Sequence, residues 1–420
     1  MAKVLLVGHV CCPDLGSEPG VTWRWASHLA AHNDVWVICH PQYRERTEAY
    51  LAKHPIAHLH FHYVNLPAWR DPWKPEKSNS GLRLHYLLWQ REMLKEARKL
   101  HAREQFDVAH QVSWTTVTAA TPLWKLPIPS LWGPVGGAIT TPKAFLSYFG
   151  SSQWAERLRT LRVKLLPFSP TIRRAAQRLT VTYATNLETV DFLKQAGAKD
   201  VRFLIDQGLL EDQCRQTPPP KSGAGKLELL WAGRLEHRKA LPIVIEALAL
   251  LPKDFPVRVR VAGEGPLEAE WKALAQAMGV ADKVEFIGFV SSEVMNTLID
   301  DSHALVFCSL RDAFGTVVME AMTCGRPVIT LDHQGIGSAL PATSAIKIPV
   351  TTPAETVRAY AEGIRQMAEP ALRERLSAGA RAYMQEQGWL KRARLMTDCY
   401  HEVSNIGTGI TMTAEVGSSR

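Results

Sequence analysis

Short apolar runs alternate with longer stretches of helical periodicity along the first half of the chain. In runs such as Val4–Val7 every residue is apolar, which is typical of strands buried on both faces of a sheet. In stretches such as Leu82–Glu104 apolar residues recur every three or four positions, which predicts amphipathic helices. The expected strands are Val4–Val7, Asp34–Cys39, Leu59–Val64, Asp107–Gln111, Pro129–Trp132 and Thr180–Ala184, and the expected helices are Val21–Ala31 and Leu82–Glu104.

The same alternation restarts after a polar segment near the middle of the chain. Residues 216–225 are rich in proline, glycine and serine, which is typical of a linker. Near the end, a long helix is expected over Leu376–Val403, and the small polar residues that follow are expected to be flexible. Between these segments the expected strands are Leu227–Ala232, Val257–Ala262, Val284–Ile287, Ala304–Cys308 and Pro327–Leu331, and the expected helices are Ala240–Leu251, Leu267–Met278, Ser292–Ile299 and Val317–Thr323.

Strands separated by helices indicate parallel sheets that are covered by helices on both faces. Because 420 residues exceed what one ordinary core holds, the pattern predicts two such α/β domains in tandem. The expected domains are residues 1–205 and 206–385, followed by a helix at 386–403 and a flexible tail at 404–420. Ligands of parallel sheets bind beyond the carboxyl ends of the strands, so functional residues are expected in the loops that follow strands.

Composition and cysteine content are those of a globular protein in a reducing compartment. Apolar residues make up 46% of the chain and charged residues 21%, and no segment reaches the roughly 18 uninterrupted apolar residues of a membrane span. The apolar run at the N-terminus is very short, so it is interpreted as a buried strand and not as a signal peptide. The seven cysteines form no C-x-x-C pair; we therefore expect reduced thiols, no metal site and a cytoplasmic location.

A net charge of +8 favours an anionic partner, and nucleoside diphosphates, phospholipids and nucleic acids all qualify. The charge gathers in residues 154–179, where seven basic residues accompany a single acid, Glu156. Such a segment can lie on an anionic bilayer at the inner face of a membrane; the alternative is an ordinary helix with a solvated face. The basic residues are Arg157, Arg159, Arg162, Lys164, Arg173, Arg174 and Arg178, interleaved with Trp154, Leu158, Leu161, Val163, Leu165, Leu166 and Phe168.

The strongest candidate chemistry lies in loops that follow strands of the second half. Arg234 and Lys239 follow the strand Leu227–Ala232, and a forked guanidinium with a point-charge ammonium suits a diphosphate leaving group. The alternative is two solvated surface cations. After the next strand, Gly263 and Gly265 permit a tight turn and close backbone approach, but they lack the G-x-G-x-x-G pattern of a dinucleotide cofactor site.

Two carboxylates, Asp312 and Glu320, stand eight positions apart around a predicted helix start. Amides at a helix N-terminus hold anions and carboxylates accept hydrogen bonds from hydroxyls, which together suit a phosphorylated polyol. Glu320 lies in an otherwise apolar helix, where a carboxylate is costly unless it is hydrogen-bonded. Phe289 and Val290 follow another strand and could contact a base, or Phe289 could be a core residue. The turn between the two acids consists of Phe314, Gly315 and Thr316.

The first half offers three further candidates after its strands. Amides of the loop that carries Gly16, Glu18 and Gly20 could face an anion or a sugar. A second backbone-rich loop, which contains Gly136 and Gly137, follows the strand Pro129–Trp132. His110 ends a strand and could face a cleft, with a hydrogen-bonded structural histidine as the alternative.

Together these residues resemble the family 4 retaining glycosyltransferases of the GT-B fold, over nearly the whole chain and most strongly between about residues 228 and 335. The resemblance implies two Rossmann-like α/β/α domains facing a cleft, the first for the acceptor and the second for a nucleotide sugar, and a C-terminal helix that crosses back. It rests on Gly-Arg-Leu-x-x-x-Lys at 233–239, Gly-x-Gly-Pro at 263–266, Gly-Phe-Val at 288–290 and the acid pair at 312 and 320, which continues as Glu-Ala-Met-x-x-Gly-x-Pro-Val.

The resemblance also implies roles. Arg234 and Lys239 would hold the donor diphosphate, Glu320 the ribose hydroxyls and Asp312 the sugar hydroxyls, with backbone amides of 314–316 on phosphate and sugar. A UDP- or GDP-sugar would donate its sugar, with retention and without a cofactor or metal, to a glycan or lipid-linked acceptor. Asp312 replaces the usual Glu, which leaves the choice of sugar open, and Ala240 replaces the usual Gly.

Two other hypotheses stay open. One is another enzyme on the same scaffold, an epimerase or a phosphorylase, but the sequence shows no motif for handling water or inorganic phosphate. The other is a non-catalytic basic protein that binds nucleic acid or an anionic membrane. A general anion binder would not need the carboxylates that accompany Arg234 and Lys239, so nucleic acid is not the expected partner.

Overall fold

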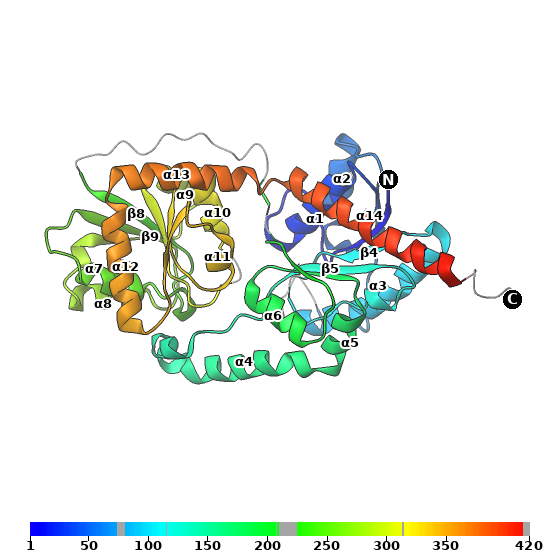
Figure 1. Ribbon diagram of the computed structural model, residues 1–420, viewed down its shortest axis with the longest axis horizontal. Helices are drawn as coiled ribbons and strands as arrows, with labels where there is room; N and C mark the ends of the chain where they lie inside the picture. The colour runs from blue at the N-terminus through cyan, green and yellow to red at the C-terminus, as the bar shows by residue number, and fades with distance from the viewer. Residues whose placement is uncertain (74–79, 115, 207, 210–224, 313–314, 415–420) are drawn as a thin grey trace. The chain divides into compact units, whose positions relative to one another are not determined.

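The computed structural model describes the whole chain except residues 74–79, 115, 207, 210–224, 313–314 and 415–420. The chain forms two compact units (Figure 1). Unit 1 comprises Met1–Ala138, Leu165–Gly208 and the chain from Trp389, and unit 2 comprises Ile139–Lys164 and Leu209–Gly388. No helix among the described residues is long and apolar enough to cross a membrane.

Unit 1 is built on a seven-stranded parallel sheet with the order β3-β2-β1-β4-β5-β6-β7. Its strands are β1 (Lys3–Val7), β2 (Asp34–Cys39), β3 (Leu59–Tyr63), β4 (Val108–Gln111), β5 (Ser130–Val135), β6 (Val181–Ala184) and β7 (Val201–Phe203). Its helices are α1 (Ser17–Leu29), α2 (Arg44–Lys53), α3 (Leu82–Glu104), α5 (Pro170–Arg178), α6 (Leu187–Gln195) and α14 (Trp389–Ala414).

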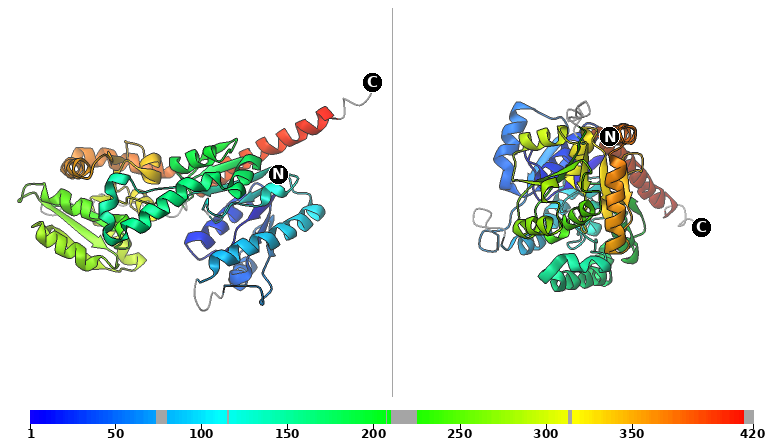
Figure 2. Two further views of the ribbon diagram at one scale, coloured as in Figure 1. Left: turned by 90° about the horizontal axis from the view of Figure 1, so that it is seen from below. Right: turned by 90° about the vertical axis from the view of Figure 1, so that its left-hand side faces the viewer.

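The last helix of the chain returns to unit 1. At its start the buried ring of Trp389 meets the ring of Trp25 in α1 edge-on, with 5.1 Å between centroids. Farther along α14, Glu402 pairs with Arg202 of β7 at 2.8 Å. The final turns of α14 project away from the rest of unit 1 (Figure 2). The predicted C-terminal helix that crosses back is therefore confirmed.

Unit 2 has a six-stranded parallel sheet with the order β10-β9-β8-β11-β12-β13 and helices on both faces (Figure 1). Its strands are β8 (Leu227–Ala232), β9 (Val257–Ala262), β10 (Val284–Gly288), β11 (Ala304–Phe307), β12 (Val328–Leu331) and β13 (Ala345–Ile348). Its helices are α4 (Gln153–Leu165, in this unit to Lys164), α7 (Pro242–Ala249), α8 (Glu268–Ala277), α9 (Ser292–Asp300), α10 (Thr316–Thr323), α11 (Gln334–Ala339), α12 (Pro353–Met367) and α13 (Pro370–Gln385).

The predicted fold class, two parallel α/β sheets in tandem, is confirmed, and the details differ in informative places. The single helix expected over Leu376–Val403 is two helices, α13 and α14, which are interrupted at residues 386–388. α14 then continues to Ala414, beyond the point where the helical pattern was expected to end. α1 begins at Ser17, four residues before the expected start, so the glycine-bearing loop enters the helix directly.

One segment from the first half of the sequence packs with the second sheet. Residues 139–164 belong to unit 2, where Phe145 and Phe149 join the core formed around β8, β9 and α7. The Tyr148 hydroxyl donates to the Glu246 carboxylate of α7 at 2.7 Å. Unit 2 therefore includes the segment 139–164, which ends more than sixty residues before β8, the first strand of this unit.

Candidate active site

The loops that follow β8, β9 and β10 pack backbone against backbone. The Gly233 amide donates to the Ala262 carbonyl at 3.0 Å, and the Gly263 amide donates to the Gly288 carbonyl at 2.8 Å. A Cβ on Gly263 would lie 2.0 Å from the Gly233 carbonyl oxygen, and one on Gly265 would lie 2.3 Å from the carbonyl oxygen of Leu235. Glycine is needed at these positions because the backbones of the loops are in direct contact. The loops therefore form a closely packed backbone surface at the carboxyl ends of these strands.

Arg234 and Lys239, two cationic side chains of the loop after β8, differ in their surroundings. Lys239 forms an ion pair with Asp312, and its ammonium also lies 5.4 Å from the centroid of the Phe307 ring. Arg234 is exposed, and its guanidinium makes no hydrogen bond or ion pair with any residue in the described part of the chain. Ala240, directly after Lys239, has φ of +48°, a conformation that favours glycine and that explains the usual residue of the resembled family.

Asp312 is the meeting point of the loops after β8 and β11. Besides Lys239 it accepts a contact from Arg238 Nη1 at 3.3 Å, while Arg238 Nε donates to Glu236 Oε1 at 2.8 Å. The positive charges of Arg238 and Lys239 are thus neutralised by Glu236 and Asp312. No described residue neutralises the charge of Arg234. An incoming diphosphate would share Lys239 with Asp312, because both offer anionic oxygens to one ammonium.

Gln334, which the sequence analysis missed, fixes the backbone around Asp312. Its buried carboxamide accepts from the Asp312 amide at 2.8 Å and donates to the Leu310 carbonyl at 2.7 Å and the Thr140 carbonyl at 3.0 Å. No motif marks this residue. The only available signal is its place shortly after strand β12, at the same edge of the sheet.

The neighbouring residue Arg311 ties the same loop to α4. Its Nε lies 3.3 Å from Glu156 Oε1, and Glu156 also accepts from Thr141 at 2.6 Å and Arg159 at 2.8 Å. Burial opposes ionisation of Glu156, but these hydrogen bonds and charges outweigh it and keep its pKa below the ordinary value. Glu156, the one acid of the basic segment, is therefore a buried anchor within unit 2.

Glu320 lies one turn from Thr316 on the exposed face of α10. The helix is otherwise apolar, as expected, but Glu320 itself is exposed, so its carboxylate is not fully buried within it. Partial desolvation still raises the pKa of Glu320 above its ordinary value. Gly315 precedes the helix, and a Cβ there would lie 2.6 Å from the Phe307 ring. Phe314 lies outside the described residues.

Phe289 and Val290 extend from the end of β10. The core alternative for Phe289 is wrong, because 77% of its surface is exposed. Its backbone amide donates to the Glu264 carboxylate at 3.3 Å, so the loop after β9 also orients the loop after β10. An exposed aromatic ring beside a dense backbone floor can stack on a planar ligand group.

The candidates of the first half lie in unit 1. Gly16 is exposed at the N-terminus of α1, and Glu18 and Gly20 lie in the first turn of that helix. A Cβ on Gly20 would lie 2.0 Å from the Leu15 carbonyl oxygen. Gly137 follows β5 with φ of +96°, and the carbonyl of its neighbour Gly136 accepts from the amide of Val117 at 2.9 Å.

His110 does not face solvent. It is buried in unit 1, where Nε2 donates to the Gly133 carbonyl at 2.8 Å and Nδ1 accepts from the Tyr400 hydroxyl of α14 at 2.7 Å. Burial lowers its pKa to about 4, so the ring is neutral at pH 7. The structure therefore favours the structural alternative, because both ring nitrogens already hold unit 1 and its C-terminal helix together.

The comparisons with known proteins agree with this geometry. Residues 215–383 match the family of glycosyl transferases group 1, and these residues carry every candidate of unit 2. Over these residues the chain is similar to group 1 glycosyl transferases. The D-inositol 3-phosphate glycosyltransferase of Streptomyces bingchenggensis is 32% identical over 212 residues, which cover 48% of this chain and 45% of that protein. The chain thus matches less than half the length of such relatives.

Solved structures extend the likeness over both units, at the level of the fold. Sucrose-phosphate synthase from Thermosynechococcus elongatus aligns over 96% of this chain and 99% of its own, with a TM-score of 0.61 and 18% identity. Anabaena Alr3699/HepE in complex with UDP-glucose aligns over 96% and 100%, with a TM-score of 0.56 and 16% identity. The predicted GT-B fold and the resemblance to GT-B glycosyltransferases are confirmed.

Proposed function

We propose that the protein is a retaining glycosyltransferase that moves a sugar from a nucleoside diphosphate sugar to a hydroxyl of a glycan or lipid-linked acceptor. One observation carries this most directly. At the carboxyl edge of a parallel sheet, Arg234 has no partner among the described residues, while Lys239 is held beside Asp312. Unpaired positive charge next to a carboxylate suits a ligand that is anionic at one end and hydroxylated at the other.

The proposed chemistry uses this charge at the leaving group. The bond between the anomeric carbon and the diphosphate oxygen breaks, and the acceptor oxygen bonds to the same face of the sugar. The acceptor's proton passes to the departing diphosphate, whose growing negative charge Arg234 and Lys239 stabilise. Removing one such donor commonly costs about 10²–10³ in turnover. Asp312 and Glu320 accept hydrogen bonds from sugar and ribose hydroxyls, and Phe289 packs on the base.

UDP is the first nucleotide to test and GDP the second, because a solved protein with the same fold, HepE, was captured with UDP-glucose. The proposed site needs no metal, since the two side-chain cations supply the positive charge. A thermal-shift panel of UDP- and GDP-sugars tests the donor. A ligand at 100 times its dissociation constant stabilises the native state by about 2.7 kcal/mol, which raises the melting temperature.

The panel is decisive when it is followed by turnover. We expect one nucleotide to raise the melting temperature and to be released as a free diphosphate when an acceptor is supplied. Retention is checked by the anomeric proton coupling of the product. Turnover with inorganic phosphate as acceptor would instead indicate a phosphorylase, and a chain that responds to no nucleotide sugar would contradict the proposal.

The acceptor side of the proposal rests on the outer face of α4. Trp154, Leu158, Leu161 and Leu165 follow one another at spacings of four, three and four, and between 53% and 71% of each side chain's surface is exposed. They form one apolar stripe, which we call the α4 stripe, whereas the opposite side of the helix holds the buried Glu156.

The charged side chains beside the α4 stripe indicate which kind of surface it would contact. Arg157, Arg162 and Lys164 are exposed, and the one acid of the helix is already paired with Arg159 and Arg311. Arg157 also lies over the Trp154 ring at 4.9 Å. No described residue forms an ion pair with these three cations. An indole and leucines flanked by such cations suit the headgroup region of an anionic bilayer, where the apolar side chains enter the interface and the cations meet phosphates. We propose that the protein works there as a cytoplasmic peripheral enzyme.

Sedimentation with vesicles tests the α4 stripe. The wild-type chain should sediment with phosphatidylglycerol-containing vesicles and much less with pure phosphatidylcholine. The double variant Leu158→Glu/Leu161→Glu should stay in solution, because two carboxylates oppose both the apolar and the charge contact. Leu250→Glu, at a leucine that is 56% exposed elsewhere in unit 2, is the matched control and should sediment like wild type. Equal sedimentation of all three would contradict the membrane proposal.

A further inference from the structure

Three buried histidines gather in unit 1, and the proposed transfer assigns none of them a role. His9 follows β1 and His40 follows β2, so both stand at the carboxyl ends of neighbouring strands. His85 reaches them from α3, and Asp71 comes from the loop after β3. The rings of His9 and His85 are 5.3 Å apart between centroids, and those of His40 and His85 are 5.1 Å apart.

The hydrogen bonds of this cluster are incomplete. His85 Nδ1 bonds Asp71 Oδ1 at 2.6 Å, and its other nitrogen, Nε2, is buried without a hydrogen-bond partner among the described residues. His9 Nε2 is buried in the same condition. The exposed fraction is 0% for His85 and 2% for His9. Buried polar atoms are nearly always satisfied, so two unpartnered imidazole nitrogens in one cluster are available to a ligand.

His40, Asp71 and His85 each offer a ligand atom, and these atoms all lie within 4.8 Å of one another. The contact between His85 and Asp71 resembles the one that orients histidine ligands of metals. The carboxylate accepts a hydrogen bond from one ring nitrogen, which fixes the ring and leaves the lone pair of the other nitrogen for a cation. His40 Nε2 now lies 3.0 Å from Asn65 Oδ1, so coordination through that atom would displace the Asn65 carboxamide.

We propose that His40 and His85, with His9 beside them and with Asp71 orienting the His85 ring, bind one divalent transition-metal ion of the Zn²⁺ class. Imidazole nitrogens with a carboxylate suit Zn²⁺, Co²⁺ or Fe²⁺ better than Mg²⁺ or Ca²⁺, which prefer oxygen ligands alone. A metal here would join the loop that carries Asp71 and the helix α3 to the ends of β1 and β2. The site would be structural and would order this edge of unit 1, separately from the proposed donor site of unit 2.

Two alternative occupants fit less well. A phosphate or carboxylate would lie beside the Asp71 carboxylate, which already accepts from His85, and the two anions would repel each other. A purely apolar role is consistent with the ring of Trp73, 4.9 Å from that of His85. That role does not account for the unpartnered ring nitrogens of His9 and His85. A phenylalanine at either position would pack in the same way without burying such a nitrogen.

Metal binding is measured directly on the full-length, tag-free chain after chelator treatment and dialysis. We expect one equivalent of Zn²⁺ by calorimetry and elemental analysis, and visible absorption bands when Co²⁺ is added instead. His85→Asn should abolish stoichiometric binding. Asp71→Asn keeps a carboxamide beside His85 and should weaken binding at least ten-fold, as loss of such an orienting group does.

His54→Asn is the matched control, because His54 is an exposed histidine of the same unit, and it should bind metal like wild type. Circular dichroism shows which variants are folded, and Asp71→Asn keeps the test valid if His85→Asn unfolds. The proposal is overturned if the wild-type chain binds no stoichiometric metal. It is equally overturned if folded Asp71→Asn and His85→Asn both bind as wild type does.

Discussion

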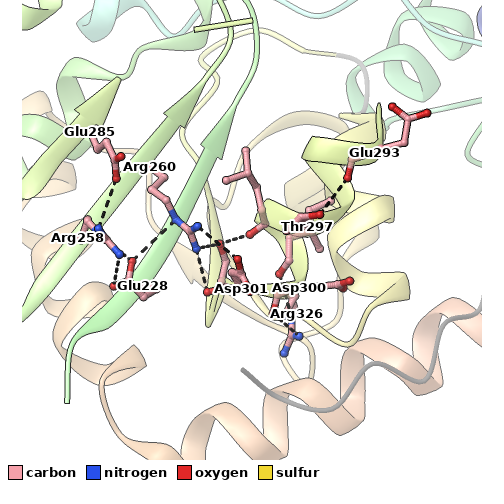
Figure 3. A network of polar contacts seen from close by, with 12 residues as sticks. Glu228, Arg258, Arg260, Glu285, Glu293, Thr297, Asp300, Asp301 and Arg326 are labelled. Carbon is pink, nitrogen blue, oxygen red and sulfur yellow. Dashed lines mark hydrogen bonds and ion pairs between the residues drawn. The ribbon is translucent and has the colours of Figure 1, made fainter. Parts of the chain in front are cut away.

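The charged residues at the two ends of the unit 2 strands differ in how they are paired. The side of the sheet where the strands begin is called the amino edge here, and the side where they end is called the carboxyl edge. At the amino edge, Glu228 accepts from Arg258 at 2.9 and 3.0 Å and lies 3.9 Å from Arg260, which in turn donates to the Asp301 carbonyl at 2.9 Å (Figure 3). Nearby, the buried Arg326 donates to the carbonyls at the end of α9. Each of these arginines is hydrogen-bonded within the protein.

The carboxyl edge leaves charge available. Lys239, Arg238, Asp312 and Glu236 balance one another, but Arg234 is exposed without a partner in the described chain. Charged side chains occur at both edges, so their presence alone does not mark a site. What distinguishes the carboxyl edge is a cation that the protein does not neutralise, beside glycines that keep the backbone open to a ligand.

The largest expected effect is on turnover at the carboxyl edge. Lys239→Ala should lower turnover of the nucleotide sugar by about 10²–10³, because the ammonium stabilises the departing diphosphate. Steady-state kinetics measures this, and Lys272→Ala, a surface lysine that is paired with Glu268 one turn away, is the control. Comparable turnover in the two variants would remove the functional difference between the edges.

The next effect is on stability at the amino edge. Arg326→Ala should lower the free energy of unfolding by about 2–4 kcal/mol, because it leaves the buried carbonyls of Ile299 and Asp300 without their donor. Urea unfolding measures the loss, and turnover at low temperature should stay near wild type. A variant with normal stability and poor turnover would reverse the assignment of the two edges.

A smaller effect is expected at the unpaired cation. Arg234→Ala should lower turnover of the nucleotide sugar by about 10², the lower end of the loss expected for one donor to the departing diphosphate, and should raise the KM roughly ten-fold. The melting temperature should not change, since the side chain is exposed without a partner in the described chain. Arg258→Ala at the amino edge is the control. The Arg258 side chain is 44% exposed, so its ion pair with Glu228 should contribute about 0.5 kcal/mol or less to the free energy of unfolding.

The smallest effect concerns pH. His303 accepts from the Glu228 amide at 2.9 Å, and burial with the nearby charges of Arg373, Arg326 and Arg260 lowers its pKa below 6.5 despite Glu228. The unfolded chain then binds more protons, so this contribution is present above pH 6.5 and is lost as the pH falls below it. His303→Asn keeps an acceptor and should flatten the pH dependence of urea unfolding between about pH 7 and 5; an unchanged slope would contradict this assignment.

The fold could be predicted because buried parallel strands are apolar on both faces and so stand out along the chain. The two strands that were missed, β7 and β13, lie at sheet edges, where Arg202 and Lys347 interrupt the apolar pattern. The affiliation of residues 139–164 with unit 2 could not be read from periodicity, because it depends on contacts with residues more than ninety positions away.

The candidate site was predictable to the extent that its residues follow strands. Arg234, Lys239 and Asp312 do so, and the structure joins the last two in an ion pair. Gln334 was missed because it acts through backbone contacts that leave no motif. The ring of His110 points inward, which strand periodicity did not reveal. The histidine cluster of unit 1 leaves no sequence motif, because its members come from four separate segments of the chain that only the fold brings together.

Calorimetric titration of the chelator-treated protein with UDP and GDP tests the central claim most directly, because it measures donor binding without an acceptor or a membrane. The account predicts saturable binding of one of these nucleotides by wild type and by Arg258→Ala, and at least ten-fold weaker binding by Arg234→Ala and Lys239→Ala. Equal affinity in all four proteins, or no binding of either nucleotide by wild type, would contradict it.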